Sequence, residues 1–213
     1  MEAEVLRIVI AIVISYLLGS IPCAYIAGRL VKGVDIRQVG GGNVGALNVM
    51  REIGTAAGFA VLIADMAKGL LAVVIAQWLG LSLVFVFLAG FVAVAGHNWS
   101  VFLRFQGGMG AATTLGVLLG LVPIEFAISF AIIVIVVLIT SNFRLGIGVG
   151  LAFLPLIIWL FGGEGSLIVY SVVLPLFSVL KSLPGLKKAL TSGASKEGII
   201  VDKQFKPWQR RKK

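Results

Sequence analysis

The sequence has very little of the chemistry on which metalloenzymes and disulfide-stabilised proteins depend. Its 213 residues include one cysteine, Cys23, and one histidine, His97. A single cysteine excludes a disulfide within the chain and any metal site built from several cysteines. One histidine leaves too few ligands for a typical zinc or iron centre. We therefore expect neither a metal nor a cofactor.

Charge is also scarce. Only 13% of the residues are charged, whereas soluble domains carry about a quarter. Hydrophobic residues make up 59% of the chain, and the mean hydropathy is +1.08. A water-soluble fold could not bury this much apolar surface, so the sequence predicts an integral membrane protein.

The apolar runs are continuous and do not alternate with polar residues, which excludes a β-barrel pattern and predicts helices. We therefore predict an all-α polytopic membrane protein with about seven transmembrane helices. Junctions at Val122-Pro123 and at "FGGEG" leave five spans as the alternative. A helical membrane domain, residues 1–181, is followed by a basic tail, residues 182–213. The seven segments lie near 6–31, 56–79, 82–97, 111–122, 124–140, 145–162 and 166–181.

The placement of cations predicts the orientation. The loops 32–55 and 98–110 and the tail carry most of the arginines and lysines, so these parts are expected in the cytoplasm and the amino terminus outside. Both five and seven spans agree with this orientation. The net charge of +9 is explained by a tail that binds anionic membrane lipids, and nucleic acid is not an expected partner. The expected location is the cytoplasmic (inner) membrane of a bacterium.

The first of these loops reads "GGGNVGALNVMREIG" and combines glycines with polar side chains. Successive glycines can turn backbone N–H groups toward one point, which suits a phosphate or an acyl oxyanion. Amide side chains add neutral donors, and the guanidinium of Arg51 adds a fork for phosphate oxygens. A tight connection between two helices is the alternative. The candidate residues are Gly40, Gly41, Gly42, Asn43, Gly45, Asn48 and Arg51.

The second loop, "GHNWSVFLRFQGGMG", follows the same plan. His97 ends an apolar segment, and "QGGMG" precedes the next one, where a helix amino terminus can bind an anion. His97 is a candidate base, with a hydrogen-bonding helix end as the alternative. Both glycine loops are predicted on one face of the membrane, which favours a shared site.

Asp65 and Lys68 lie within an apolar segment, in "DMAKG". Charged groups in hydrocarbon are costly and are usually paired or face a polar cavity. Their i, i+3 spacing permits a mutual pair on one helix face. They form either a self-satisfied pair or the floor of a polar pocket.

These residues resemble successive signatures of the bacterial acylphosphate:glycerol-3-phosphate acyltransferases (the PlsY family). The resemblance rests on "YLLGSIPCAYIAGRL", "DIRQVGGGNVGALNVMREIG", "DMAKG" and "GHNWSVFLRFQGGMGAATTLG", over about residues 10 to 120. It implies a helical membrane bundle whose cytoplasmic loops form the active site. It also implies transfer of an acyl group from acyl phosphate to the 1-position of glycerol 3-phosphate, without a metal or coenzyme A.

The resemblance assigns roles to particular residues. His97 and Asn43 become the catalytic candidates, and Arg51 helps to hold phosphate. Asp65 is assigned to the structure or the pocket. The proposed substrate- and phosphate-binding set is Gly40, Gly41, Gly42, Gly45, Asn48, Arg51, Lys68, Gly107, Gly108, Gly110 and Thr113.

The chain also departs from the family pattern, because it lacks a serine, a threonine, two lysines, a histidine and an asparagine of the signatures. The positions concerned are Gly41, Leu47, Gln106, Met109, Ser182 and Gly185. We therefore expect weak acylation of glycerol 3-phosphate itself. Two hypotheses follow: an acyltransferase that uses acyl phosphate and a small hydroxyl acceptor, or a non-catalytic paralogue that binds lipids or anions or acts as a small transporter.

Overall fold

The computed structural model describes the backbone of residues 2–191 and the side chains of residues 2–181. The side chains of Ser182 and Gly185 and the rest of the predicted basic tail lie outside these described residues. The chain divides into two compact units, Met1–Leu121 and Val122–Lys213, and each is described by itself.

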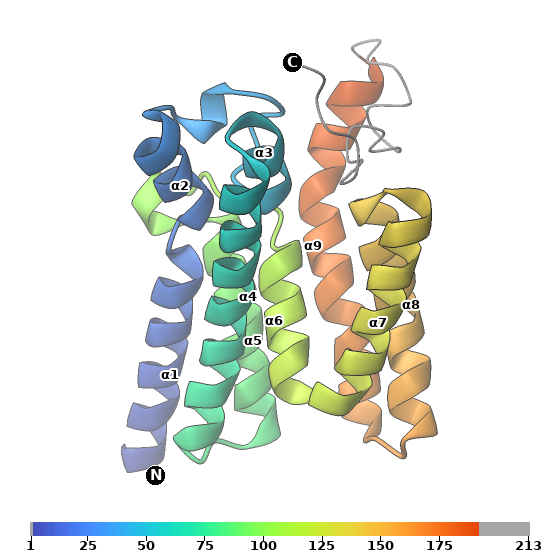
Figure 1. The fold of residues 1–213 in the computed structure, drawn as a ribbon. Coiled ribbons are helices and arrows are strands. Elements are labelled where there is room, and N and C mark those ends of the chain that lie inside the picture. Colours follow the sequence, from blue (N-terminus) through green and yellow to red (C-terminus); the bar gives the residue numbers. More distant parts are fainter. Residues whose placement is uncertain (1, 192–213) are drawn as a thin grey trace. The chain divides into compact units, whose positions relative to one another are not determined.

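The first unit is built around a long central helix. Helix α4 (Thr55–Trp78) packs against α1, α3, α5 and α6, and α1 also packs along α5. Figure 1 shows α2 and α3 together at one end of this unit, with the amino terminus at the other end. The elements are α1 (Glu2–Ser20), α2 (Cys23–Lys32), η1 (Ile36–Gln38), α3 (Ala46–Glu52), α4, α5 (Leu83–Asn98), η2 (Val101–Leu103) and α6 (Ala111–Leu121).

Glycines allow the apolar helices of this unit to approach closely. A Cβ atom on Gly116 of α6 would overlap the backbone of Met66 on α4, and one on Gly19 of α1 would overlap the backbone of Ala93 on α5. Small residues play this part in membrane helices, because lipid supplies no hydrophobic force that pushes helices together. The close approach of these helices brings Asp65 of α4 beside His97 of α5.

A break at Ile21 and Pro22 separates α1 from α2. Proline has no N–H, so the α-helical bonding pattern cannot continue through it. Side chains from other parts of the unit satisfy carbonyl groups at the break. The Ser100 hydroxyl donates a hydrogen bond to the Ser20 carbonyl (2.5 Å), and the Lys68 ammonium donates one to the Ile21 carbonyl (3.0 Å). The break is therefore a polar point between apolar helices.

The second unit contains α7 (Pro123–Thr140), α8 (Phe143–Leu160) and α9 (Gly165–Thr191), with α8 packed against both of the others. Asn142 caps α8, since its side-chain oxygen accepts the N–H of Leu145 at 3.1 Å. The Ser129 hydroxyl donates to the Gly150 carbonyl at 2.8 Å and ties α7 to α8.

The structure confirms the all-helical membrane class. Within residues 2–191 every regular element is helical, and five stretches are long and apolar enough to cross a membrane. Ala111–Leu121 and Gly165–Lys181 are shorter apolar helices. The predicted loop 32–55 contains two elements that sequence patterns did not indicate, η1 and α3.

Candidate functional site

The side chain of Asn48 organises the first glycine loop. It is buried at the first turns of α3, and its amide nitrogen lies within hydrogen-bond distance of the carbonyl oxygens of Ile36 (3.2 Å), Val39 (3.1 Å) and Asn43 (3.0 Å). Its side-chain oxygen accepts the N–H of Gly41 at 3.2 Å. One amide therefore holds both halves of the loop, and all its described contacts are to the backbone.

The glycines of this loop serve different purposes. Gly40 and Gly42 have positive φ angles, 58° and 67°, which other residues adopt only with strain. The N–H groups of Gly41 and Gly42 are bonded within the protein, to Asn48 Oδ1 and to the Val39 carbonyl. These two groups shape the loop in this conformation and do not point together at an anion.

The second loop folds back over His97. The N–H of Gly108 donates to the His97 carbonyl at 3.1 Å. A Cβ atom on Gly108 would collide with His97 Nε2 and would lie 2.5 Å from the Val44 carbonyl oxygen. A Cβ atom on Gly107 would collide with the His97 carbonyl oxygen. Both glycines are required because backbone packs directly on the histidine, and Val44 brings the first loop to the same point.

Three buried ionisable groups lie beneath this contact. Asp65 Oδ1 is 2.7 Å from Lys68 Nζ and 3.6 Å from His97 Nδ1. The side chains are 2%, 5% and 7% exposed for Asp65, Lys68 and His97. The carboxylate neutralises the ammonium and faces one imidazole nitrogen, while the other nitrogen faces Gly108. The predicted Asp65–Lys68 pair is thus present and also forms part of a larger polar cluster.

A small cavity lies where the two loops, the α1–α2 break and the polar cluster meet. Its volume is about 10 Å³, the space of one water molecule or one substrate oxygen. It is lined by Ser20, Ile21, Pro22, Cys23, Ala24, Val44, Asp65, Lys68, His97, Ser100, Leu103, Gly107 and Gly108.

The structure brings five of the predicted site residues to this cavity: Asp65, Lys68, His97, Gly107 and Gly108. Other predicted residues lie elsewhere. Arg51 is exposed on α3, and Asn43 is half-buried in the first loop. Thr113 is fully buried in α6, where its carbonyl packs against Gly69 of α4. Gly110 has a φ of 77° and precedes α6, so it shapes the entry to that helix.

Sequence reasoning missed the contribution of the α1–α2 break. Ser20, Cys23 and Ser100 line the cavity, yet none was a candidate. The signal was present, because Pro22 within an apolar run marks a helix break, and a break in a membrane helix needs polar partners. Among the described residues no cluster of three or more His, Cys, Asp or Glu side chains could hold a metal.

A family model described as glycerol-3-phosphate acyltransferase matches residues 9–191. Among similar curated proteins, glycerol-3-phosphate acyltransferase 2 of Moorella thermoacetica is 41% identical over 189 residues, covering 89% of this chain and 97% of the relative. Glycerol-3-phosphate acyltransferase 1 of Dehalococcoides mccartyi is 40% identical over 203 residues, covering 92% and 98%.

Solved structures give a consistent comparison. The glycerol 3-phosphate form of PlsY (YgiH), an integral membrane glycerol 3-phosphate acyltransferase, superposes with a TM-score of 0.77 at 30% identity. The superposition covers 88% of this chain and 93% of the PlsY chain. The lysophosphatidic acid form of the same protein gives a TM-score of 0.75.

Proposed function

Because this chain belongs to the glycerol-3-phosphate acyltransferase family, we propose that it transfers an acyl group from acyl phosphate to glycerol 3-phosphate or a related small hydroxyl acceptor. It is an integral-membrane acyltransferase of phospholipid biosynthesis. The acceptor oxygen attacks the acyl carbon, the bond from that carbon to the phosphate oxygen breaks, and the departing phosphate takes the hydroxyl proton. The non-catalytic alternative is not favoured by the relatives.

The observation that supports this proposal is the meeting of both glycine loops over His97, with Asp65 and Lys68 beneath. The cavity has room for one oxygen atom, so we place the reacting oxygen at its mouth and the rest of each substrate outside it. Acyl phosphate is already activated, so positioning and charge neutralisation contribute more than a strong base.

We assign roles to individual residues on the basis of their contacts, their exposure and their chemistry. Asp65 orients His97 through Nδ1, and Lys68 offsets the carboxylate charge while it holds the α1–α2 break. We assign Arg51, which is exposed on α3, to the binding of phosphate oxygens through its planar guanidinium fork. Asn48 shapes the loop that carries Asn43. We further propose that these loops face the cytoplasm of a bacterial inner membrane, where phosphorylated metabolites are made.

The site has fewer cations than two phosphorylated substrates would favour. The family pattern has a serine at Gly41 and lysines at Gln106 and Met109. Gly41 is exposed, and a Cβ atom there would meet no atom within 4 Å. Gln106 is exposed and Met109 is half-buried. The fold therefore has room for all three family side chains.

The test is lysophosphatidic acid formed per unit of folded protein from acyl phosphate and glycerol 3-phosphate. We expect slow formation by the wild type and at least a tenfold increase in the triple variant Gly41→Ser/Gln106→Lys/Met109→Lys, since charge-assisted contacts are worth about 1.5–3 kcal/mol each. The control Gln38→Lys adds a cation to exposed η1 and should leave the rate unchanged. The proposal is wrong if neither folded protein acylates glycerol 3-phosphate or a panel of small alcohols.

A further inference from the structure

Helix α2 is not needed to cross the bilayer, because α1 is long enough to do so alone. At 1.5 Å per residue, the 19 residues of α1 extend about 28 Å, close to the thickness of the hydrocarbon core. The break at Pro22 follows directly. Since α1 alone can span the hydrocarbon, the ten residues of α2 belong at the membrane surface, at the end of the unit that carries α3 (Figure 1).

The sides of α2 differ in chemistry. Ala24 and Gly28 are buried against the unit. Ile26 and Leu30, one helical turn apart, are 43% and 80% exposed. On the neighbouring edge, the cationic residue Arg29 is also exposed. A short helix with an exposed apolar edge beside a cationic edge is suited to the boundary between acyl chains and headgroups.

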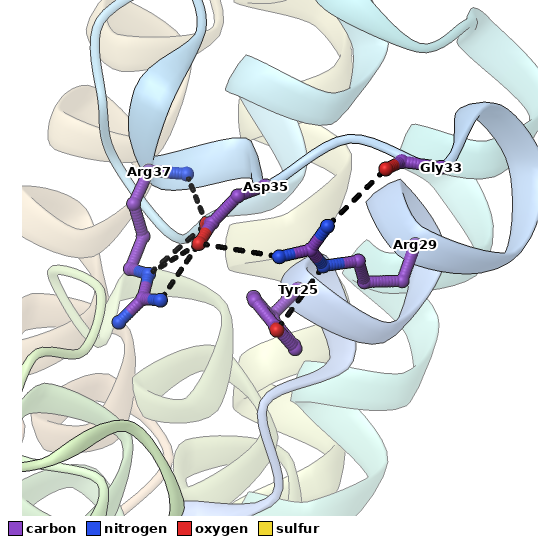
Figure 2. A network of polar contacts seen from close by, with 5 residues as sticks. All are labelled: Tyr25, Arg29, Gly33, Asp35 and Arg37. Carbon is purple, nitrogen blue, oxygen red and sulfur yellow. Dashed lines mark hydrogen bonds and ion pairs between the residues drawn. The ribbon is translucent and has the colours of Figure 1, made fainter.

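The arginine of α2 belongs to a fixed cluster with a second arginine (Figure 2). Arg37 donates to both Asp35 carboxylate oxygens, at 3.0 Å to Oδ1 and 2.7 Å to Oδ2. Arg29 Nη2 lies 3.7 Å from Asp35 Oδ2. Both guanidinium carbons lie over the ring of Tyr25, 5.2 Å and 5.3 Å from its centroid.

Further contacts fix Arg29. Its Nε donates to the Tyr25 hydroxyl at 3.1 Å, and its Nη1 donates to the Gly33 carbonyl at 3.2 Å. Two guanidinium groups are therefore held beside one buried carboxylate, and one positive charge is left over. Arg29 and Arg37 remain 47% and 30% exposed, so each can still donate toward solvent. Preorganised guanidinium groups match the oxygens of a phosphate.

We propose that the surface formed by Tyr25, Arg29, Arg37 and the exposed edge Ile26/Leu30 binds the phosphodiester headgroup of an anionic phospholipid. The guanidinium groups contact the phosphate, and Ile26 and Leu30 contact the upper part of the acyl chains. The charge complementarity and the apolar edge together select a lipid over a free anion. This surface is separate from the cavity, because none of its five residues lines the cavity.

The proposal is tested with the purified full-length protein in detergent micelles, with phosphatidylglycerol or phosphatidylcholine added and the shift in thermal unfolding temperature measured. Phosphatidylglycerol should stabilise the wild type more than phosphatidylcholine does, and added NaCl should reduce the difference. Arg29→Gln should weaken the apparent affinity for phosphatidylglycerol about fivefold, as expected for one cation at a membrane surface. Arg29→Lys keeps the positive charge but loses the planar guanidinium group, so it should retain part of the affinity for phosphatidylglycerol.

The matched control is Arg7→Gln, which removes an exposed cation from α1, the helix before the break, and should behave as the wild type does. Arg29→Gln leaves the bonds between Arg37 and Asp35 intact, so it is expected to fold. Equal phosphatidylglycerol shifts in wild type and Arg29→Gln overturn the proposal. The proposal is also overturned if high salt leaves the phosphatidylglycerol-induced shift in unfolding temperature unchanged. It is overturned as well if inorganic phosphate alone produces a shift of the same size.

Discussion

At Gly108 the second loop meets both the imidazole of His97 and the first loop. The missing side chain of Gly108 leaves room for His97 Nε2 and the Val44 carbonyl. The N–H of Gly108 also donates to the His97 carbonyl, so the loop is tied to the backbone of the histidine that its glycine packs against. The histidine is thus held between an Asp65 oxygen on one side and glycine on the other.

We expect Gly108→Ala to lower acyltransferase turnover by more than tenfold, because the added methyl group pushes the loop off His97. Overpacking of this kind costs about 1–3 kcal/mol of stability. The matched control is Gly148→Ala in α8, where a Cβ atom would meet nothing within 4 Å. Turnover and thermal unfolding are measured for both variants. Wild-type turnover in a folded Gly108→Ala protein would contradict the tight packing.

The contacts of Asp35 predict how the folding stability of the protein changes at acid pH. Hydrogen bonds from the Arg37 guanidinium lower the pKa of the Asp35 carboxyl from 3.8 to about 2, although burial opposes this shift. A carboxyl whose pKa is lower in the folded state stabilises the fold above the unfolded pKa, and this stabilisation is lost as the pH falls from about 4 to about 2.

Asp35→Asn should therefore destabilise the protein at pH 6 by about 1–3 kcal/mol, since two guanidinium groups lose their anion. The difference between variant and wild type should shrink as the pH approaches 2. Thermal unfolding between pH 6 and pH 3 gives the trend. Glu4→Gln, at an exposed position of α1, is the control and should show no such difference. A constant difference across this range would show that Asp35 acts by its shape and not by its charge.

At the scale of elements, helix α4 supplies two charges that a membrane helix can carry only as a pair. Asp65 and Lys68 lie on one face of α4, where Lys68 also reaches the carbonyl of Ile21, 47 positions away in the sequence. Burial of a charge is tolerated when a partner and hydrogen bonds satisfy it. The α1–α2 break is stable because α4 brings an ammonium group to it.

We expect Lys68→Met to cost about 3–5 kcal/mol in unfolding free energy, because it leaves the Asp65 carboxylate buried without its cation. The double variant Asp65→Asn/Lys68→Met should recover part of that loss. Thermal or denaturant unfolding of the two single variants and the double variant completes the cycle. Strict additivity of the two losses would argue that the residues do not act as a pair.

At the scale of the whole molecule, the distribution of cations predicts which face of the membrane the loops occupy. In the structure, the first and second loops meet at one cavity, so they lie on the same face. We expect that face to be cytoplasmic.

Single cysteines at positions 41 and 106, introduced into a Cys23→Ser background, should react with an impermeant thiol reagent only after the cells are opened. Both positions are exposed in the folded protein, so access to solvent does not limit labelling. A cysteine at position 2 is the control and should react in intact cells. Labelling of position 41 or 106 from outside would reverse the predicted orientation.

The sequence by itself determined the membrane class, the all-helical fold and the positions of most apolar helices, although the segment expected at 6–31 is divided into α1 and α2. Segments expected at 56–79 and 124–140 are α4, Thr55–Trp78, and α7, Pro123–Thr140. These features were predictable because hydropathy and helix breakers act locally along the chain. The Asp65–Lys68 pair was foreseen for the same reason, since its spacing is a property of one helix.

Only the tertiary structure decided which polar residues share a site. Helix α3 forms around Asn48, whose contacts reach back to Ile36, and no apolar period marks so short an element. Ser20 and Ser100, 80 positions apart, meet because α1 and α5 pack closely. The packing of α4 against α5 placed Asp65 beside His97, and the packing of α4 against α6 left Thr113 in a helix interface. Such contacts depend on how whole helices fit together, which no local pattern of residues specifies.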